Sequence, residues 1–260
     1  MMYRKILKLA LPLPDITKYE RYLFIGPHPD DIEVGCGGLI SKLSKAGKEI
    51  YFAIVTDGGA GSFNLDTSPE QLIKIRKEES LKSKDVLEVK DVFFLDFPDC
   101  GDYRIWDAAK AVAKICLEID PEIIFAPDPK MPSEIHPDHI KTGRASEISV
   151  MMSQYPLIYL RNIGEIPQEY KQNFNFRAIA LYYTHRPNKY VNLNSEDIEM
   201  QKKAIEKHQS QFSNQEDLSM IYRYMTIRGR IFGSHGKRGK EGYFVRSSQQ
   251  QHCFPEVNFY

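Results

Sequence analysis

The chain has 260 residues, of which 35 are Lys or Arg and 35 are Asp or Glu, so its formal net charge is zero at pH 7. Without a basic excess, the composition argues against a dedicated nucleic-acid binder and against electrostatic anchoring to a membrane. Apolar residues make up 42% of the chain, which is typical of a folded globular protein. Zero net charge provides little colloidal repulsion, so it favours a defined homo-oligomer.

The four cysteines lack the CxxC spacing of metal and redox motifs, so we expect reduced thiols and no disulfide framework. The sequence contains no run of 18 apolar residues, and we expect no transmembrane helix. The N-terminal segment is not followed by a small-residue cleavage site, so we do not interpret it as a signal peptide. A cytoplasmic location is the resulting expectation.

The first 150 residues alternate strand and helix patterns. Short apolar runs predict strands at residues 21–26, 49–56, 91–96 and 122–126. Helices are expected at residues 36–46, 69–88, 103–119 and 139–151. Continuous apolar strands that alternate with helices are typical of a parallel sheet covered on both faces. We therefore expect an α/β fold with a Rossmann-like, doubly wound, mostly parallel sheet.

The second half of the chain is less regular. We expect a strand at residues 176–184, helices at 195–208 and 218–232, and a flexible glycine-rich loop at 233–242. The whole chain, residues 1–260, is interpreted as a single domain. Its expected parts are an N-terminal arm (1–20), a core (20–150), and a substrate-loop and C-terminal extension (151–260).

Two segments rich in His and Asp follow predicted strands. Gly26-Pro27-His28-Pro29-Asp30-Asp31 follows the first strand, and a proline-rich segment that ends in His136-Pro137-Asp138-His139 follows the fourth. In a doubly wound sheet these two strands are neighbours, and ligands bind beyond their carboxyl ends. We therefore expect His28, Asp31 and His139 to lie within reach of one metal ion. Two imidazoles and a carboxylate suit a catalytic zinc with a fourth position for water.

Each segment also has a simpler interpretation. Asp30 and Asp31 could cap the helix that follows them, and His136 and His139 could be surface loop residues. The glycine cluster Gly35-x-Gly37-Gly38 could bind a nucleotide phosphate, but it lacks the GxGxxG spacing, so close packing of the helix is favoured. The coincidence of both segments at adjacent strand ends favours the metal site.

The two motifs resemble those of the PIG-L/LmbE-like zinc-dependent de-N-acetylases. Further shared features are Thr56-Asp57-Gly58-Gly59, Arg76-x-x-Glu79 and the segment 204–212, which contains His208-x-Ser210-Gln211. The resemblance covers roughly residues 20–245, and its motif style is closest to the diacetylchitobiose deacetylase branch. Many members have Glu directly after the two aspartates. Here Ile32 stands in that place, and Glu33 is assigned no catalytic role.

The resemblance implies a hydrolase that removes the acetyl group from an N-acetylglucosamine-containing small molecule, giving acetate and a free amino sugar. Zn²⁺ would be held by His28, Asp31 and His139, and Fe²⁺ or another divalent ion suits the same ligands. Asp30 would act as general base and later return the proton to the leaving amine. Protonated His136 would help the metal to stabilise the oxyanion, with Asp138 orienting and charging His136.

Substrate contacts are expected at Arg76, Asp57 and His252. Arg76 would lie near the sugar hydroxyls, although a surface ion pair with Glu79 is an alternative. Asp57 could bind sugar or only form a turn. For His208, and similarly for His185, a structural hydrogen bond is favoured over a direct catalytic part.

The C-terminal tail is aromatic and is expected to dock. It carries His252 together with Phe254, Phe259 and Tyr260. The tail could pack on its own subunit or line a neighbour's active site, and we favour the interface. The resemblance makes a trimer or hexamer the expected assembly.

Three function classes are left open by the sequence. The favoured one is the deacetylase, acting on a chito-oligosaccharide such as diacetylchitobiose or on a GlcNAc-malate-type thiol precursor. The second is a non-catalytic, metal-bearing sugar-binding protein, which would have no use for the free carboxylate of Asp30. The third is a nucleotide-binding Rossmann protein.

Overall fold

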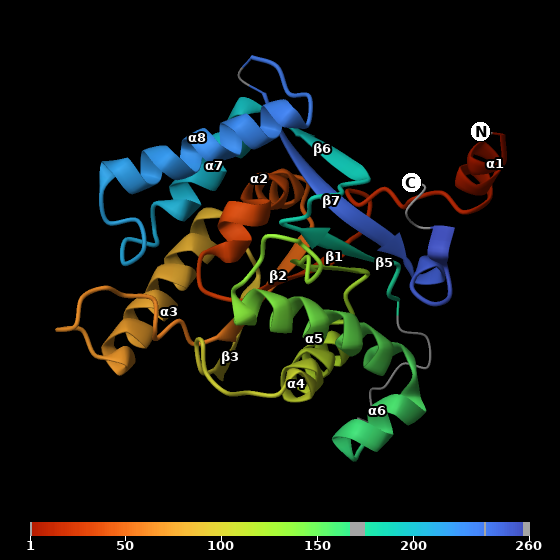
Figure 1. The fold of residues 1–260 in the computed structure, drawn as a ribbon, viewed down its shortest axis with the longest axis horizontal. Helices are drawn as coiled ribbons and strands as arrows, with labels where there is room; N and C mark the ends of the chain where they lie inside the picture. Colours follow the sequence, from red (N-terminus) through yellow and green to blue (C-terminus); the bar gives the residue numbers. More distant parts are fainter. Residues whose placement is uncertain (1, 167–174, 237, 257–260) are drawn as a thin grey trace.

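The computed structural model of the chain describes residues 2–166, 175–236 and 238–256. A mixed sheet with the strand order β3-β2-β1-β4-β5-β7-β6 runs through the molecule, with helices on both faces (Figure 1). Its strands are β1 (Arg21–Gly26), β2 (Glu49–Thr56), β3 (Asp91–Phe97), β4 (Ile123–Pro127), β5 (Ala178–Tyr182), β6 (Lys189–Leu193) and β7 (Gly239–Ser247). The expected Rossmann-like α/β fold is therefore confirmed.

The first four strands follow the sequence-based expectation closely. β1 pairs in parallel with β2 on one side and with β4 on the other, and Leu23 lies opposite both Tyr51 and Ile124. The carboxyl ends of β1 and β4 consequently lie side by side. This adjacency brings together the two segments that carry the His and Asp residues.

The helices that accompany these strands begin close to the motifs. They are α1 (Met2–Ala10), α2 (Asp31–Lys45), α3 (Pro69–Val86), α4 (Ile105–Ile119), α5 (Pro137–Gln154), α6 (Pro156–Ile163), α7 (Ser195–Ile205) and α8 (Gln215–Ile231). α2 starts five residues earlier than its predicted start at residue 36, since Asp31 and Glu33 occupy a first turn that favours negative charge. None of the described helices has the length and apolar character needed to cross a bilayer.

The C-terminal half extends the same sheet instead of forming a separate layer. β5 continues the parallel sheet beside β4, whereas β7 runs antiparallel to β5 and to β6. The prediction of a loop at residues 233–242 is wrong for its last four residues, because β7 begins at Gly239. A Cβ on Gly239 would lie 3.0 Å from Ile198, and one on Gly242 would lie 3.0 Å from Phe232. These two glycines allow β7 to pack closely against Ile198 and Phe232.

Two apolar layers hold the helices on the sheet. On one face, aromatic side chains of the central strands, including Phe24, Phe52 and Phe125, pack beneath α2 and α7. On the other face, β1 and β2 residues such as Ile25 and Val55 pack against α4 and α5. Phe24 and Phe125 stack with ring centroids 4.4 Å apart. This contact fixes β1 against β4, and with it the relative position of the two loops that follow.

The glycine cluster of α2 lets the helix lie unusually close to its neighbours. A Cβ on Gly35 would lie 2.7 Å from the ring of Tyr182, and one on Gly37 would lie 2.7 Å from Gln201. The Gln201 amide donates hydrogen bonds to the carbonyl oxygens of Glu33 and Val34, at 2.9 and 3.3 Å. The cluster is therefore occupied by protein side chains, which supports the packing interpretation over nucleotide binding.

We predict that Gly35→Ala destabilises the fold. The Tyr182 ring is fully buried, and its hydroxyl donates to the carbonyl oxygen of Ile25 at 2.8 Å, so the ring has no room to retreat. Overpacking of this kind costs about 1–3 kcal/mol. Denaturant unfolding should show this loss, and Lys42→Ala on the same helix should lie within about 0.5 kcal/mol of the parent. Equal stability of Gly35→Ala and the parent would contradict the packing account.

Candidate metal and catalytic site

The loops after β1 and β4 bring His28, Asp31 and His139 together. One ligand atom from each of the three lies within 4.8 Å of the other two. An Asp31 carboxylate oxygen, Oδ2, lies 3.0 Å from His28 Nδ1 and 3.4 Å from His139 Nε2. Two imidazoles and a carboxylate oxygen form a donor set suited to zinc or iron. The predicted residues are thus in position to hold one divalent ion.

His28 is surrounded by an excess of negative charge. Its Nδ1 faces Asp31, and its Nε2 lies 3.2 Å from Asp99 Oδ1 and 3.3 Å from Asp138 Oδ2. Burial disfavours a charged imidazole, but hydrogen bonds with Asp138, Asp31 and Asp99 raise the pKa of His28 to about 12. The three carboxylates carry more negative charge than one protonated imidazole can neutralise. The remaining negative charge is suited to a divalent cation.

A second group of possible ligands shares His28. It consists of His28, Asp99, His136 and Asp138, whose ligand atoms also lie within 4.8 Å of one another. The two groups lie on opposite sides of the His28 ring, because Nδ1 faces Asp31 and Nε2 faces Asp99 and Asp138. With a metal on the Nδ1 side, Asp99 and Asp138 would hold the ring orientation from the Nε2 side.

His139 is oriented by two neighbours that the motif does not contain. Its Nδ1 lies 3.0 Å from Glu134 Oε2, an ion-pair contact that does not have hydrogen-bond geometry. The Tyr183 ring stacks on the imidazole, with centroids 6.0 Å apart and planes 11° apart. The Tyr183 hydroxyl also donates to the carbonyl oxygen of Asp31 at 3.2 Å. Tyr183 therefore contacts two of the three candidate ligands.

Asp30 lies beside the ligand group without belonging to it. Its backbone has φ 122°, a strained conformation for a residue with a side chain, and strain of this kind gathers at functional sites. It holds the N-cap position of α2 but makes no capping hydrogen bond with its side chain. Burial raises the pKa of Asp30 to about 6, against the opposing charge of Arg76. The simple capping interpretation therefore does not explain this carboxylate.

The expected partnership of Asp138 with His136 differs from what the structure has. The Asp138 carboxylate is 3.9 Å from His136 Nδ1, beyond hydrogen-bond distance, and is engaged by His28 and by the Cys100 amide at 2.7 Å. The Asp138 main-chain N–H instead donates to His136 Nδ1 at 3.3 Å. Burial lowers the pKa of His136, and nearby His28 and His139 lower it further. Asp138 thus supports His28, and His136 accepts a main-chain hydrogen bond at Nδ1.

Arg76 is buried behind Asp30. Its guanidinium donates to the Asp30 carboxylate at 3.2 Å and to the carbonyl oxygens of Pro29 at 2.7 Å and Gly58 at 3.1 Å. The alternative of a surface ion pair between Arg76 and Glu79 is wrong, since both side chains are buried and Glu79 bonds Ser210. These hydrogen bonds make Arg76 a support for Asp30.

Asp57 and His252 are the other two predicted substrate contacts. Asp57 lies in the loop after β2, and His252 lies beyond the end of β7. Asp57 Oδ1 accepts from the main-chain N–H groups of Gly59 and Asp99, at 2.9 and 3.2 Å, which favours the turn-forming alternative. His252 is exposed and follows β7, which ends beside the first residue of β5, at the edge of the sheet opposite the metal ligands. It does not line the site of its own chain. Phe259 and Tyr260 fall outside the described residues.

A buried framework behind the site involves the segment 208–211. His208 Nε2 lies 3.0 Å from Glu33 Oε1, which also accepts from the Ser83 hydroxyl at 2.6 Å. Burial disfavours charge on His208, but the adjacent Glu33 raises the pKa of its imidazole. The expectation of a structural hydrogen bond at His208 is thus confirmed, whereas His185 is exposed.

The next residues of the segment bind two more parts of the site. The Ser210 main-chain N–H and hydroxyl donate to the Glu79 carboxylate on α3, at 2.7 and 2.6 Å. The Gln211 amide donates to the carbonyl oxygen of Gly61 at 2.9 Å. The segment therefore ties α2, α3 and the loop after β2 into one unit behind Asp30 and Arg76.

Sequence reasoning missed two carboxylates of the site, Asp99 and Glu134. Asp99 follows β3, and Glu134 precedes the second motif by two residues. The available signals were weak: an acidic residue just beyond a strand end, and an acidic residue in a proline-stiffened loop. Asp99 contacts His28, which is distant in the sequence. Glu134 contacts His139, which is near in the sequence, but only the folded loop brings the two side chains together.

Comparisons with known proteins agree with this geometry. The PIG-L family, described as GlcNAc-PI de-N-acetylase, matches residues 23–149. A diacetylchitobiose deacetylase of Thermococcus kodakarensis is 32% identical over 207 residues, which are 79% of this chain and 74% of the relative. The chain belongs to the PIG-L de-N-acetylase family.

Two further matches bear on the branch within this family. The solved structure of N,N′-diacetylchitobiose deacetylase from Pyrococcus horikoshii has a TM-score of 0.87 and 31% identity, and it covers 100% of this chain and 97% of its own. A probable N-acetyl-α-D-glucosaminyl L-malate deacetylase of Bacillus cereus is 31% identical over 128 residues, 47% of this chain and 57% of the relative. The likeness to the diacetylchitobiose enzymes thus extends over far more of the chain.

We predict that His208→Ala lowers the free energy of unfolding by about 3 kcal/mol, because it leaves the buried Glu33 carboxylate without its ionic partner. Denaturant unfolding measures the change. His185→Ala, which removes an exposed histidine, is the matched control and should behave like the parent. If both variants are equally stable, the framework does not contribute to the fold as described.

Proposed function

We propose that the protein is a metal-dependent N-deacetylase that hydrolyses the acetamide of an N-acetylglucosamine-containing small molecule to acetate and a free amino sugar. The observation that carries the proposal is the partly buried carboxylate of Asp30, left outside the ligand group and held by Arg76 beside it. A protein that only bound metal or sugar would not need this group. Membership of a de-N-acetylase family supports the same reaction.

His28, Asp31 and His139 are the residues that would hold the metal, which we propose to be zinc, with iron as the alternative. Such an ion, when bound, lowers the pKa of water to about 7 and polarises an acyl oxygen. Asp99 and Asp138 would orient His28, and Glu134 would orient His139.

Asp30 would take a proton from the attacking water and later deliver it to the leaving nitrogen. Its partly buried position suits this exchange, because desolvation of the carboxylate makes proton acceptance easier, and the hydrogen bond from Arg76 fixes where the carboxylate points. One water is consumed: its oxygen joins the acetyl carbon, the C–N bond breaks, and the amine leaves with the returned proton.

His136 would stabilise the oxyanion that develops on the acetyl oxygen. Since its Nδ1 accepts a hydrogen bond from the Asp138 main chain, the neutral ring carries its proton on Nε2 and can donate it. This role needs no charged imidazole, which replaces the protonated His136 of the sequence-based prediction.

Diacetylchitobiose or a related chito-oligosaccharide is the substrate that we favour over a GlcNAc-malate conjugate. The support is the likeness to diacetylchitobiose deacetylases over most of the chain, against less than half for the malate enzyme. Cytoplasmic location and assembly into a trimer or hexamer stay predictions. In such an assembly His252 could reach the substrate only in a neighbouring subunit's site.

The test compares two substitutions at the site. We predict that Asp30→Asn keeps the bound metal but loses acetate release by about 10²–10⁴-fold, the usual contribution of a general base. His139→Ala should lose both metal and activity. Acetate release from diacetylchitobiose and metal content per chain are measured on the same samples.

Asp85→Asn makes the same chemical change on an exposed position of α3 and should match the parent in both measurements. Full activity in Asp30→Asn would exclude the general-base role. Absence of acetate from every N-acetylated sugar tested with the parent, in the presence of zinc or iron, would exclude the deacetylase function.

A further inference from the structure

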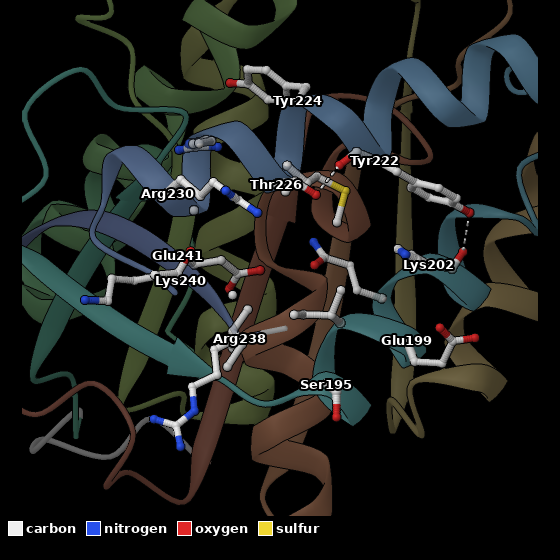
Figure 2. Close-up of a pocket in the computed structure, with 18 of the residues that line it drawn as sticks. Ser195, Glu199, Lys202, Tyr222, Tyr224, Thr226, Arg230, Arg238, Lys240 and Glu241 are labelled. Atoms are coloured by element: carbon white, nitrogen blue, oxygen red, sulfur yellow. Dashed lines mark hydrogen bonds between the residues drawn. The ribbon is translucent and has the colours of Figure 1, made fainter. Parts of the chain in front are cut away.

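A cavity of about 320 Å³ lies between α7, α8, the start of β7 and the α2 residues Val34 and Gly35 (Figure 2). None of the candidate metal ligands is among the residues that line it. Its size is at the lower end of small-molecule sites, which run from about 300 to 1,000 Å³. The cavity is therefore a second place where a small ligand could bind.

Positive charge gathers around this cavity. Its lining includes Lys202 from α7, Arg228 and Arg230 from α8, and Arg238 and Lys240 at the start of β7. Within residues 2–166, 175–236 and 238–256, none of these five side chains forms an ion pair, whereas other cations of the molecule do. For example, Arg246 pairs with Glu147 at 2.6 Å, and Arg21 pairs with Glu49 at 2.6 Å. In a chain of zero net charge, this concentration of unpaired cations produces a local positive potential that attracts anions.

The two carboxylates in the lining do not neutralise the cluster. Glu241 accepts hydrogen bonds from the main-chain N–H groups of Gly38 and Leu39, at 3.0 and 2.9 Å, and from the Tyr243 hydroxyl at 2.6 Å. Its oxygens are thereby directed at α2 and at β7 itself. Glu199 is exposed on α7. The lining thus holds five cationic and two acidic side chains, and of the acidic ones Glu199 is exposed and Glu241 is already bonded to main-chain N–H groups and to Tyr243.

Two of the cations are held in place by aromatic rings. Lys202 Nζ lies 4.9 Å from the centre of the Tyr222 ring, whose hydroxyl donates to Glu206 at 2.8 Å. The Arg228 guanidinium lies 5.5 Å from the Phe232 ring. Side chains restrained in this way lose less freedom when they bind an anion. Figure 2 shows Lys202 on the α7 side of the cavity and Arg230 on the α8 side.

The chemistry of the lining identifies the kind of ligand. A phosphomonoester carries about two negative charges at pH 7, and guanidinium groups match its oxygens with paired N–H donors. The Ser195 hydroxyl, which also lines the cavity, can serve the uncharged part of such a molecule, whereas the Tyr222 and Thr226 hydroxyls already donate to Glu206 and to the Tyr222 carbonyl oxygen. We propose that this cavity binds a sugar-sized phosphomonoester, at a site separate from the metal ligands.

Glucose 6-phosphate is a suitable probe, with glucose as its uncharged counterpart, and calorimetry measures binding to the full-length protein. We expect one glucose 6-phosphate per chain and no detectable binding of glucose. The double variant Arg230→Gln/Arg238→Gln should weaken glucose 6-phosphate at least tenfold. Arg161→Gln/Arg223→Gln removes the same charge from exposed positions outside the cavity and should leave binding within twofold.

The variant His139→Ala distinguishes binding in this cavity from binding at the metal ligands. It should bind glucose 6-phosphate like the parent, whether or not the protein is a deacetylase. Loss of binding in His139→Ala would place the phosphate at the metal ligands and overturn the proposal. It would equally be overturned by the absence of glucose 6-phosphate binding to the parent, or by equal weakening in the two double variants.

Discussion

The organisation of the site depends on the excess of carboxylates around His28. Asp31, Asp99 and Asp138 approach this one imidazole from the start of α2, the loop after β3 and the start of α5. Such a cluster of carboxylates is unfavourable in a partly buried site unless cations compensate it. The fold holds the cluster together through the pairing of β1 with β4 and the stacking of Phe24 on Phe125. Because the fold keeps these carboxylates close together, the site favours the binding of a cation.

Around this centre, each reactive group has a support that lies further inside the protein. Arg76 donates a hydrogen bond to Asp30, the Asp138 main chain donates one to His136, and Glu134 lies in ion-pair contact with His139. The segment 208–211 then links α2 and α3 behind these supports. Because the glycines of α2 allow Tyr182 and Gln201 to pack directly on the helix, the first turn that carries Asp31 is fixed as well. Reactive groups and framework form one connected unit.

The sequence predicted much of this arrangement because the signals were local. The strands β1 to β4, the parallel sheet, and the meeting of His28, Asp31 and His139 all follow from apolar runs and from the position of motifs at strand ends. β6 and β7 were missed because Lys189–Leu193 is mixed in polarity and the glycines near 239 resemble a loop. Asp99 and Glu134, the Asp138–His28 contact and the cationic cavity depend on residues that are brought together only by tertiary packing.

A metal titration of the parent protein shows most directly whether the carboxylate cluster around His28 belongs to a catalytic metal site. Metal is removed with a chelator, zinc is added back in known amounts, and acetate released from diacetylchitobiose is measured at each step. We expect negligible acetate without metal, followed by a rise that saturates at one zinc per chain. Full acetate release by the metal-free protein would exclude a catalytic metal.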